Sequence, residues 1–160
     1  ILDLPKAQHP KRTIRVILWG AEEIGLIGAR AYAKAHSQEL DKHIMAWESD
    51  FGAGPIWKIN SNIDERAIAA FKEMARILGP IGIDYGHNQG RGGPDVSPLQ
   101  AAGVPVAQLA QDGSDYFDLH HTADDTLDKV DPAALAQNVA AYAAFAYLVA
   151  KSDVDFRSAE

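Results

Sequence analysis

The chain has 160 residues, of which 47% are apolar and 23% charged, as is ordinary for one soluble globular domain. Its net charge of −7 comes from 15 Lys and Arg against 22 Asp and Glu. This acidic balance argues against a nucleic-acid partner, whose phosphates require a basic face. The absence of cysteine excludes disulfides and thiolate metal sites.

The first half of the chain predicts strands that alternate with helices. Residues 13–19 (TIRVILW) read as a strand buried on both faces, and residues 23–36 as the helix that follows it. A second strand is expected at 43–48 and a short one at 56–59. An amphipathic helix is expected at 63–78, where apolar residues recur at helical spacing.

The second half continues the same alternation. A glycine-rich loop at 80–94 is followed by a short helix at 97–102 and a strand at 104–109. A polar loop at 111–126 leads to a final helix, with Asp131 as its cap and Pro132 at its first position. This order predicts an α/β domain with a largely parallel sheet, without an internal domain boundary.

The final helix contains the longest apolar stretch, residues 133–150. Gln137 and Asn138 interrupt this stretch, which is also rich in alanine. The pattern therefore indicates a packed helix and no membrane span.

Polar side chains follow three of the predicted strands. Glu22 and Glu23 come after the first strand, Asp50 after the second, and His120 and His121 in the loop after the last. Ligands bind outside the carboxyl ends of strands in such sheets, so these groups are expected to converge. Carboxylates and imidazole suit a zinc ion, and of two adjacent glutamates one could bind metal while the other takes a proton from the metal-bound water.

Each group also has an ordinary structural interpretation. The two glutamates could complement the positive end of the helix that they open. Asp50 could be a turn residue, and His121 a surface histidine. Spacing alone leaves these alternatives open.

Three motifs in a fixed order add a resemblance. The stretches "LWGAEEIGLIGA", "ESDFG" at 48–52 and "HTADDT" at 121–126 resemble those of the co-catalytic di-zinc aminopeptidase family, which includes the bacterial leucyl aminopeptidases. The stretch "KRTIRVILWGAEEIG" together with "ESD" is most similar to the plasma glutamate carboxypeptidase branch. The resemblance runs from about Arg12 to the final helix. It implies a three-layer α/β/α fold of the zinc-exopeptidase type, with a mostly parallel, mixed sheet and two zinc ions.

The resemblance also implies site residues. Glu22 would be the general base, Glu23 and His121 would bind one zinc ion, and Asp50 would bind the other. Four further residues receive weaker roles: Asp95 as an acidic residue lining the pocket, His120 as a substrate contact or packed loop residue, Asp125 as a residue that orients or caps the His121 loop, and Tyr116 as a pocket or core residue.

The resemblance further implies that residues 1–160 are the C-terminal half of a single catalytic domain. The family has a histidine and a bridging aspartate upstream of the two glutamates, and His9 and Asp3 lie in no matching motif. The chain by itself is therefore expected to bind metal weakly, to hydrolyse little and to expose sheet edges that favour association. A homodimer and an exported location are compatible with the resemblance.

The implied activity is metal-dependent exopeptidase hydrolysis of a peptide or dipeptide, by an aminopeptidase or a dipeptidase. Two alternatives remain at this stage. One is a glutaminyl-cyclase-like acyltransferase with one zinc ion. The other is a non-catalytic peptidase-like ectodomain, which would have no use for this group of costly buried charges.

Overall fold

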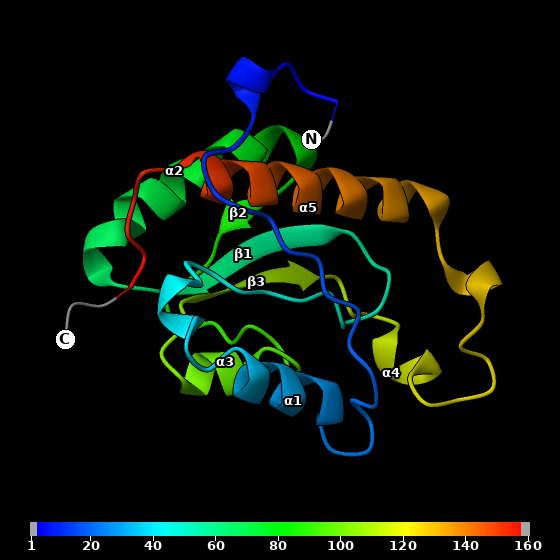
Figure 1. The fold of residues 1–160 in the computed structure, drawn as a ribbon. Helices are drawn as coiled ribbons and strands as arrows, with labels where there is room; N and C mark the ends of the chain where they lie inside the picture. Colours follow the sequence, from blue (N-terminus) through cyan, green and yellow to red (C-terminus); the bar gives the residue numbers. More distant parts are fainter. Residues whose placement is uncertain (1–2, 158–160) are drawn as a thin grey trace.

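The computed structural model describes residues 3–157, in which three strands and five α-helices form a layered α/β fold (Figure 1). The strands are β1 (Ile56–Asn62), β2 (Asp84–Tyr85) and β3 (Val106–Gln111). The helices are α1 (Ile27–Ala35), α2 (Ile68–Leu78), α3 (Ser97–Ala101), α4 (Tyr116–Leu119) and α5 (Pro132–Lys151).

The strands form a mixed sheet in the order β2-β1-β3. Strand β1 pairs in parallel with β2, with Lys58 opposite Asp84, and antiparallel with β3, with Asn62 opposite Val106. Ala46 adds an isolated parallel bridge to Val106. The predicted three-layer architecture with a mixed sheet is confirmed.

Helices cover both faces of the sheet. In Figure 1, α2 and α5 lie on one face, and α1 and α3 lie on the other. The main core lies between the sheet and the first pair, where Phe71, Phe145 and Phe156 are fully buried. A smaller core on the other face is built around Leu99 and Val104, and Trp19 packs against it.

Helix α5 begins as predicted, because the Asp131 carboxylate accepts a hydrogen bond from the Ala133 N–H at 2.9 Å and Pro132 occupies the first turn. Among residues 3–157 it is the one helix with the length and apolar composition to cross a membrane. Its buried residues, among them Ala141 and Phe145, belong to the main core. The structure therefore supports a packed core helix.

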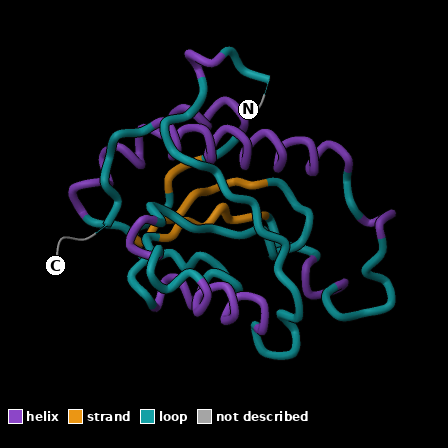
Figure 2. Tube along the Cα trace, viewed as in Figure 1, coloured by secondary structure: helices purple, strands orange, loops and turns teal. Residues whose placement is uncertain are grey.

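The prediction of a buried strand at 13–19 is wrong for the described structure. These residues form a loop (Figure 2), and the side chains of Val16 and Leu18 are 84% and 94% exposed. A run of β-branched residues becomes a strand only when a neighbouring backbone supplies its hydrogen bonds. Within residues 3–157 no named strand pairs with it.

Other element boundaries also differ from the prediction. The 43–48 segment keeps only the bridge at Ala46, and the helix expected from residue 23 begins at Ile27. The predicted 63–78 helix starts at Ile68, after a 3-10 turn at Glu65–Ala67. The two loops at 80–94 and 111–126 contain β2 and α4 respectively.

Candidate active site

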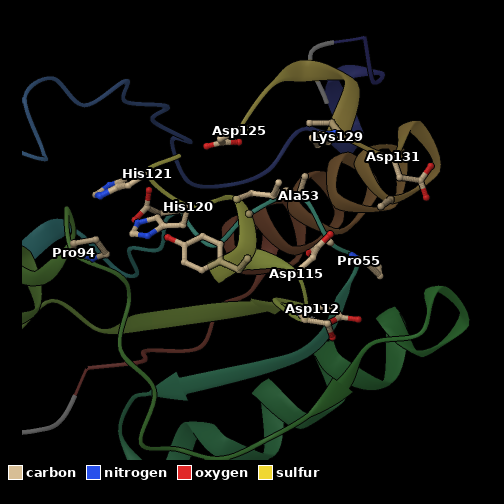
Figure 3. Close-up of a pocket in the computed structure, with 18 of the residues that line it drawn as sticks. Ala53, Pro55, Pro94, Asp112, Asp115, His120, His121, Asp125, Lys129 and Asp131 are labelled. Atoms are coloured by element: carbon tan, nitrogen blue, oxygen red, sulfur yellow. Dashed lines mark hydrogen bonds between the residues drawn. The ribbon is translucent and has the colours of Figure 1, made fainter. Parts of the chain in front are cut away.

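A hollow of about 840 Å³ lies where the predicted polar segments meet (Figure 3). The hollow is lined by the turn before α1, the loop before β1, Pro94, the residues that lead from β3 through α4 into the following loop, and the start of α5. The predicted site residues on its wall are Glu22, Glu23, Asp50, Tyr116, His120, His121 and Asp125. Convergence of these residues is what the sequence predicted, and the size suits a small ligand.

A tight turn presents the two glutamates. The N–H groups of Gly25 and Leu26 both donate to the Glu22 carbonyl at 2.9 Å, and Ala21 has a positive φ of 60°. Gly28 then packs directly on Gly20, where a Cβ atom would lie 2.7 Å from a carbonyl oxygen. Backbone hydrogen bonds within the turn thus fix its shape, and the carboxylates of Glu22 and Glu23 face the hollow.

The surroundings of the Glu22 carboxyl group favour its protonated form. Loss of hydration raises its pKa above the usual value, and the negative charges of Glu23 and Asp50 raise it further. His121 acts in the opposite direction. A carboxyl group with a raised pKa beside other carboxylates is suited to accept a proton.

Glu23 and His121 meet directly. Glu23 Oε1 lies 2.8 Å from His121 Nε2, although the two residues are 98 positions apart in the sequence. His121 adopts a positive φ of 59°, which is uncommon for a residue other than glycine. This backbone turns the imidazole toward Glu23, and such outliers tend to occur at functional sites.

The donor chemistry of this pair fits zinc. Two ligands of one tetrahedral zinc ion, at about 2.0–2.2 Å from it, lie roughly 3.3 Å apart. The observed separation of 2.8 Å is that of a direct hydrogen bond, so a small opening would admit the ion. Within residues 3–157 no group of three or more His, Asp or Glu side chains is arranged to hold a metal ion. Glu23 and His121 thus form a pair, and the described residues by themselves do not complete a metal site.

Asp50 occupies the end of the 43–50 segment, on the wall of the same hollow. Burial raises its pKa, and the charge of Glu23 raises it further, while His120 lowers it. These mutual effects place Asp50 in the same electrostatic environment as the glutamates. It is not part of the hydrogen-bonded Glu23–His121 pair.

The residues with weaker predicted roles fall in different places. Tyr116 stacks on His120. His120 lies beside His121 and stacks on it (Figure 3). Asp125 lines the hollow, and its N–H donates to the Thr122 carbonyl at 3.3 Å, so it belongs to the turn after His121. Asp95 is only 7% exposed and is not on the wall, although its neighbour Pro94 is.

The model of peptidase family M28 matches residues 2–146. The chain belongs to peptidase family M28. Carboxypeptidase Q of Mus musculus is 35% identical over 145 residues, which are 91% of this chain and 31% of that protein. Carboxypeptidase Q of Homo sapiens is 35% identical over 142 residues, with 89% and 30% covered.

A solved M28 structure is also similar. The crystal structure of a peptidase M28 precursor from Shewanella amazonensis SB2B has a TM-score of 0.95 and 56% sequence identity to this chain. The match covers 99% of this chain and 35% of that one. The chain thus spans about a third of the length of the M28 relatives that it matches.

One partly buried carboxyl group in this M28 chain was not predicted from the sequence. Glu48 Oε2 accepts a hydrogen bond from the Val96 N–H at 2.9 Å, whereas Oε1 is buried without a partner among the described residues. Asp95 Oδ1 is also buried without a hydrogen-bond partner among the described residues. The loop at 92–96 closes over Glu48 so tightly that a Cβ atom on Gly93 would lie 2.2 Å from the Glu48 carboxyl carbon. The paired glycines of "RGGPD" were the available sequence signal.

Glu48 makes the stability of the metal-free protein depend on pH. Burial raises the pKa of Glu48 from 4.5 to about 7, against the opposing effect of the Val96 hydrogen bond. Because the folded protein holds the proton more tightly than the unfolded chain, Glu48 stabilises the fold below about pH 4.5, and this contribution is lost as the pH rises through about 7. The Glu48→Gln variant, uncharged at every pH, is expected to lose less thermal stability between pH 5 and 8 than the wild type does.

This expectation is checked by the unfolding temperature in the presence of a chelator at both pH values. Glu73→Gln is the matched control, because Glu73 is exposed and paired with Arg76 and should leave the difference unchanged. An equal decrease in wild type and Glu48→Gln would show that Glu48 does not retain its proton.

Proposed function

We propose that the full-length protein is a metal-dependent exopeptidase, an aminopeptidase or a dipeptidase. One observation carries the proposal: the Glu23–His121 pair at 2.8 Å lies in the same hollow as Glu22 and Asp50. Membership of peptidase family M28 and similarity to carboxypeptidase Q support peptide bonds as the target.

The metal ligands are assigned as the motifs imply. Glu23 and His121 would hold one zinc ion and Asp50 a second, and the remaining ligands would come from parts of the protein outside these 160 residues. Bound zinc would lower the pKa of a coordinated water to about 7. Glu48 and Asp95 each have a buried carboxyl oxygen without a hydrogen-bond partner among the described residues. Burial raises the pKa of both groups, and the charge of Asp50 raises it further. A cation bound nearby would balance these negative charges.

Glu22 would carry the proton. Its carboxylate takes the proton of the attacking water as the water oxygen bonds to the scissile carbonyl carbon. When the carbon–nitrogen bond breaks, Glu22 gives that proton to the departing amine. The carboxylates that surround Glu22 favour a substrate whose free amino group is positively charged.

The proposed activity also indicates a substrate and a location for the enzyme. A small peptide or dipeptide is the proposed substrate, and the similarity to carboxypeptidase Q makes an exported enzyme our preferred proposal.

The test is an assay of the full-length protein on a dipeptide, on its N-acetylated form and on a longer peptide. We expect hydrolysis of the free dipeptide, loss of nearly all turnover after chelation and recovery when zinc is added. Cleavage of the N-acetylated form at an equal rate would contradict an aminopeptidase or a dipeptidase, since both require the free amino group. Turnover that survives exhaustive chelation would contradict metal dependence, and the longer peptide separates an aminopeptidase from a dipeptidase.

A further inference from the structure

Four aromatic rings form a continuous stack, and three of them, Tyr116, His120 and His121, line the wall of the hollow. Phe51 stacks on Tyr116 with ring centroids 4.2 Å apart, and Tyr116 stacks on His120 at 4.7 Å. His120 in turn stacks on His121 at 3.8 Å. All three pairs are close to parallel, with interplanar angles of 21°, 27° and 20°.

Two glycines leave the space that the stack needs. A Cβ atom on Gly52 would lie 3.1 Å from the Tyr116 ring, and Gly52 also has a positive φ of 74°. A Cβ atom on Gly113 would lie 2.1 Å from the Phe51 ring. The backbone on both sides is therefore shaped around the rings, which indicates a built arrangement and not a chance contact.

The stack joins two segments that carry different site residues. Phe51 directly follows Asp50, and His120 directly precedes His121. Within residues 3–157 no hydrogen bond or ion pair links residues 49–51 to residues 116–121. The ring contacts, together with the electrostatic attraction between Asp50 and His120, thus connect the segment of Asp50 directly to that of His121.

We propose that this stack, with Tyr116 at its centre, is the element that sets the position of the His121 imidazole relative to Asp50. The inference rests on the proposed function, since it concerns how the two proposed metal-binding segments are held together. His121 has a positive φ of 59°, a conformation that persists only when its surroundings impose it. Tyr116 is accordingly a positioning residue that acts through the two imidazoles.

The test compares three variants of the full-length protein. Tyr116→Leu removes the central ring and is expected to weaken zinc binding about 10–100-fold, as loss of groups that orient metal ligands typically does. Tyr116→Phe keeps the ring and should restore an affinity within about threefold of the wild type. Phe117→Leu is the matched control, because Phe117 is 75% exposed and touches the same rings only edge-on.

Two readouts separate this inference from the proposed function. Zinc affinity is measured by chelator competition, and the His121 imidazole NMR signals are recorded in the metal-free protein. Tyr116→Leu should move or broaden those signals, whereas Tyr116→Phe should not. A wild type that binds no zinc would end the proposed function, while the metal-free signals would still decide the role of the stack.

The inference is overturned if Tyr116→Leu leaves both readouts at wild-type values. It is also overturned if Tyr116→Phe is as damaging as Tyr116→Leu, because the hydroxyl and not the ring would then be responsible. Should Tyr116→Leu fail to fold, Phe51→Leu shortens the stack from its far end, and a smaller change of the same kind is expected. An unchanged His121 signal in folded Phe51→Leu would overturn the inference as well.

Discussion

The Glu22→Gln variant of the full-length protein is expected to lose about 10²–10⁴-fold in kcat on a dipeptide, the usual contribution of a general base. Glutamine has nearly the same size as glutamate but cannot take a proton from water. Its amide leaves the Glu23–His121 pair in place, so zinc affinity should stay close to the wild-type value. Steady-state kinetics and chelator competition measure the two quantities.

Glu23→Gln and Glu73→Gln complete this experiment. Glu23→Gln should weaken zinc binding as well as turnover, because it replaces one partner of the His121 pair. Glu73 lies on the exposed face of α2, so Glu73→Gln should change neither zinc binding nor turnover. A Glu22→Gln variant with wild-type kcat would remove Glu22 from the mechanism, and one that loses zinc would make Glu22 a ligand.

The parts of the site that the sequence predicted rest on signals within short stretches of the chain. The motifs that contain Glu23 and His121 are such stretches, and their fixed order, not local geometry, predicted that these two residues lie together, as they do at 2.8 Å. Helix α5 is another such case, since Asp131 and Pro132 determine its start within the sequence itself. Local signals of this kind need no partner from elsewhere in the chain.

The parts that the sequence did not predict depend on distant partners. The run 13–19 has strong β propensity, yet Val16 and Leu18 face solvent because the described residues offer it no paired strand. The burial of Glu48 arises from a loop more than forty residues away that closes over it, with Val96 as its hydrogen-bond donor. The four-ring stack likewise requires Phe51 and Tyr116, which are far apart in the sequence, to pack against each other. Residue patterns do not encode such encounters.

The Phe145→Ala variant is expected to lower the free energy of unfolding by about 3–5 kcal/mol, the usual result of truncating a buried phenylalanine. Phe145 is fully buried, and its ring makes edge contacts with Trp47 at 5.0 Å and with Phe71 at 5.7 Å between centroids. Val139→Ala is the matched control on the same helix, because Val139 is 62% exposed and should cost no more than about 0.5 kcal/mol. Urea denaturation measures both losses.

Phe145→Ala also tests whether the packing of the core determines the position of Asp50. The 43–50 segment that carries Asp50 is held by the bridge at Ala46, by the Tyr142 hydroxyl, which donates to the Glu48 carbonyl at 3.0 Å, and by the packing of Trp47 on Phe145. Phe145→Ala protein that remains folded should therefore bind zinc more weakly than the wild type, whereas Phe145→Leu, which leaves a smaller cavity, should lose less of both stability and affinity. If Phe145→Ala lowered the free energy of unfolding by less than about 1 kcal/mol, the packing of Phe145 in the core would be contradicted. If it lowered stability as expected but left zinc affinity unchanged, Asp50 would be positioned independently of the core.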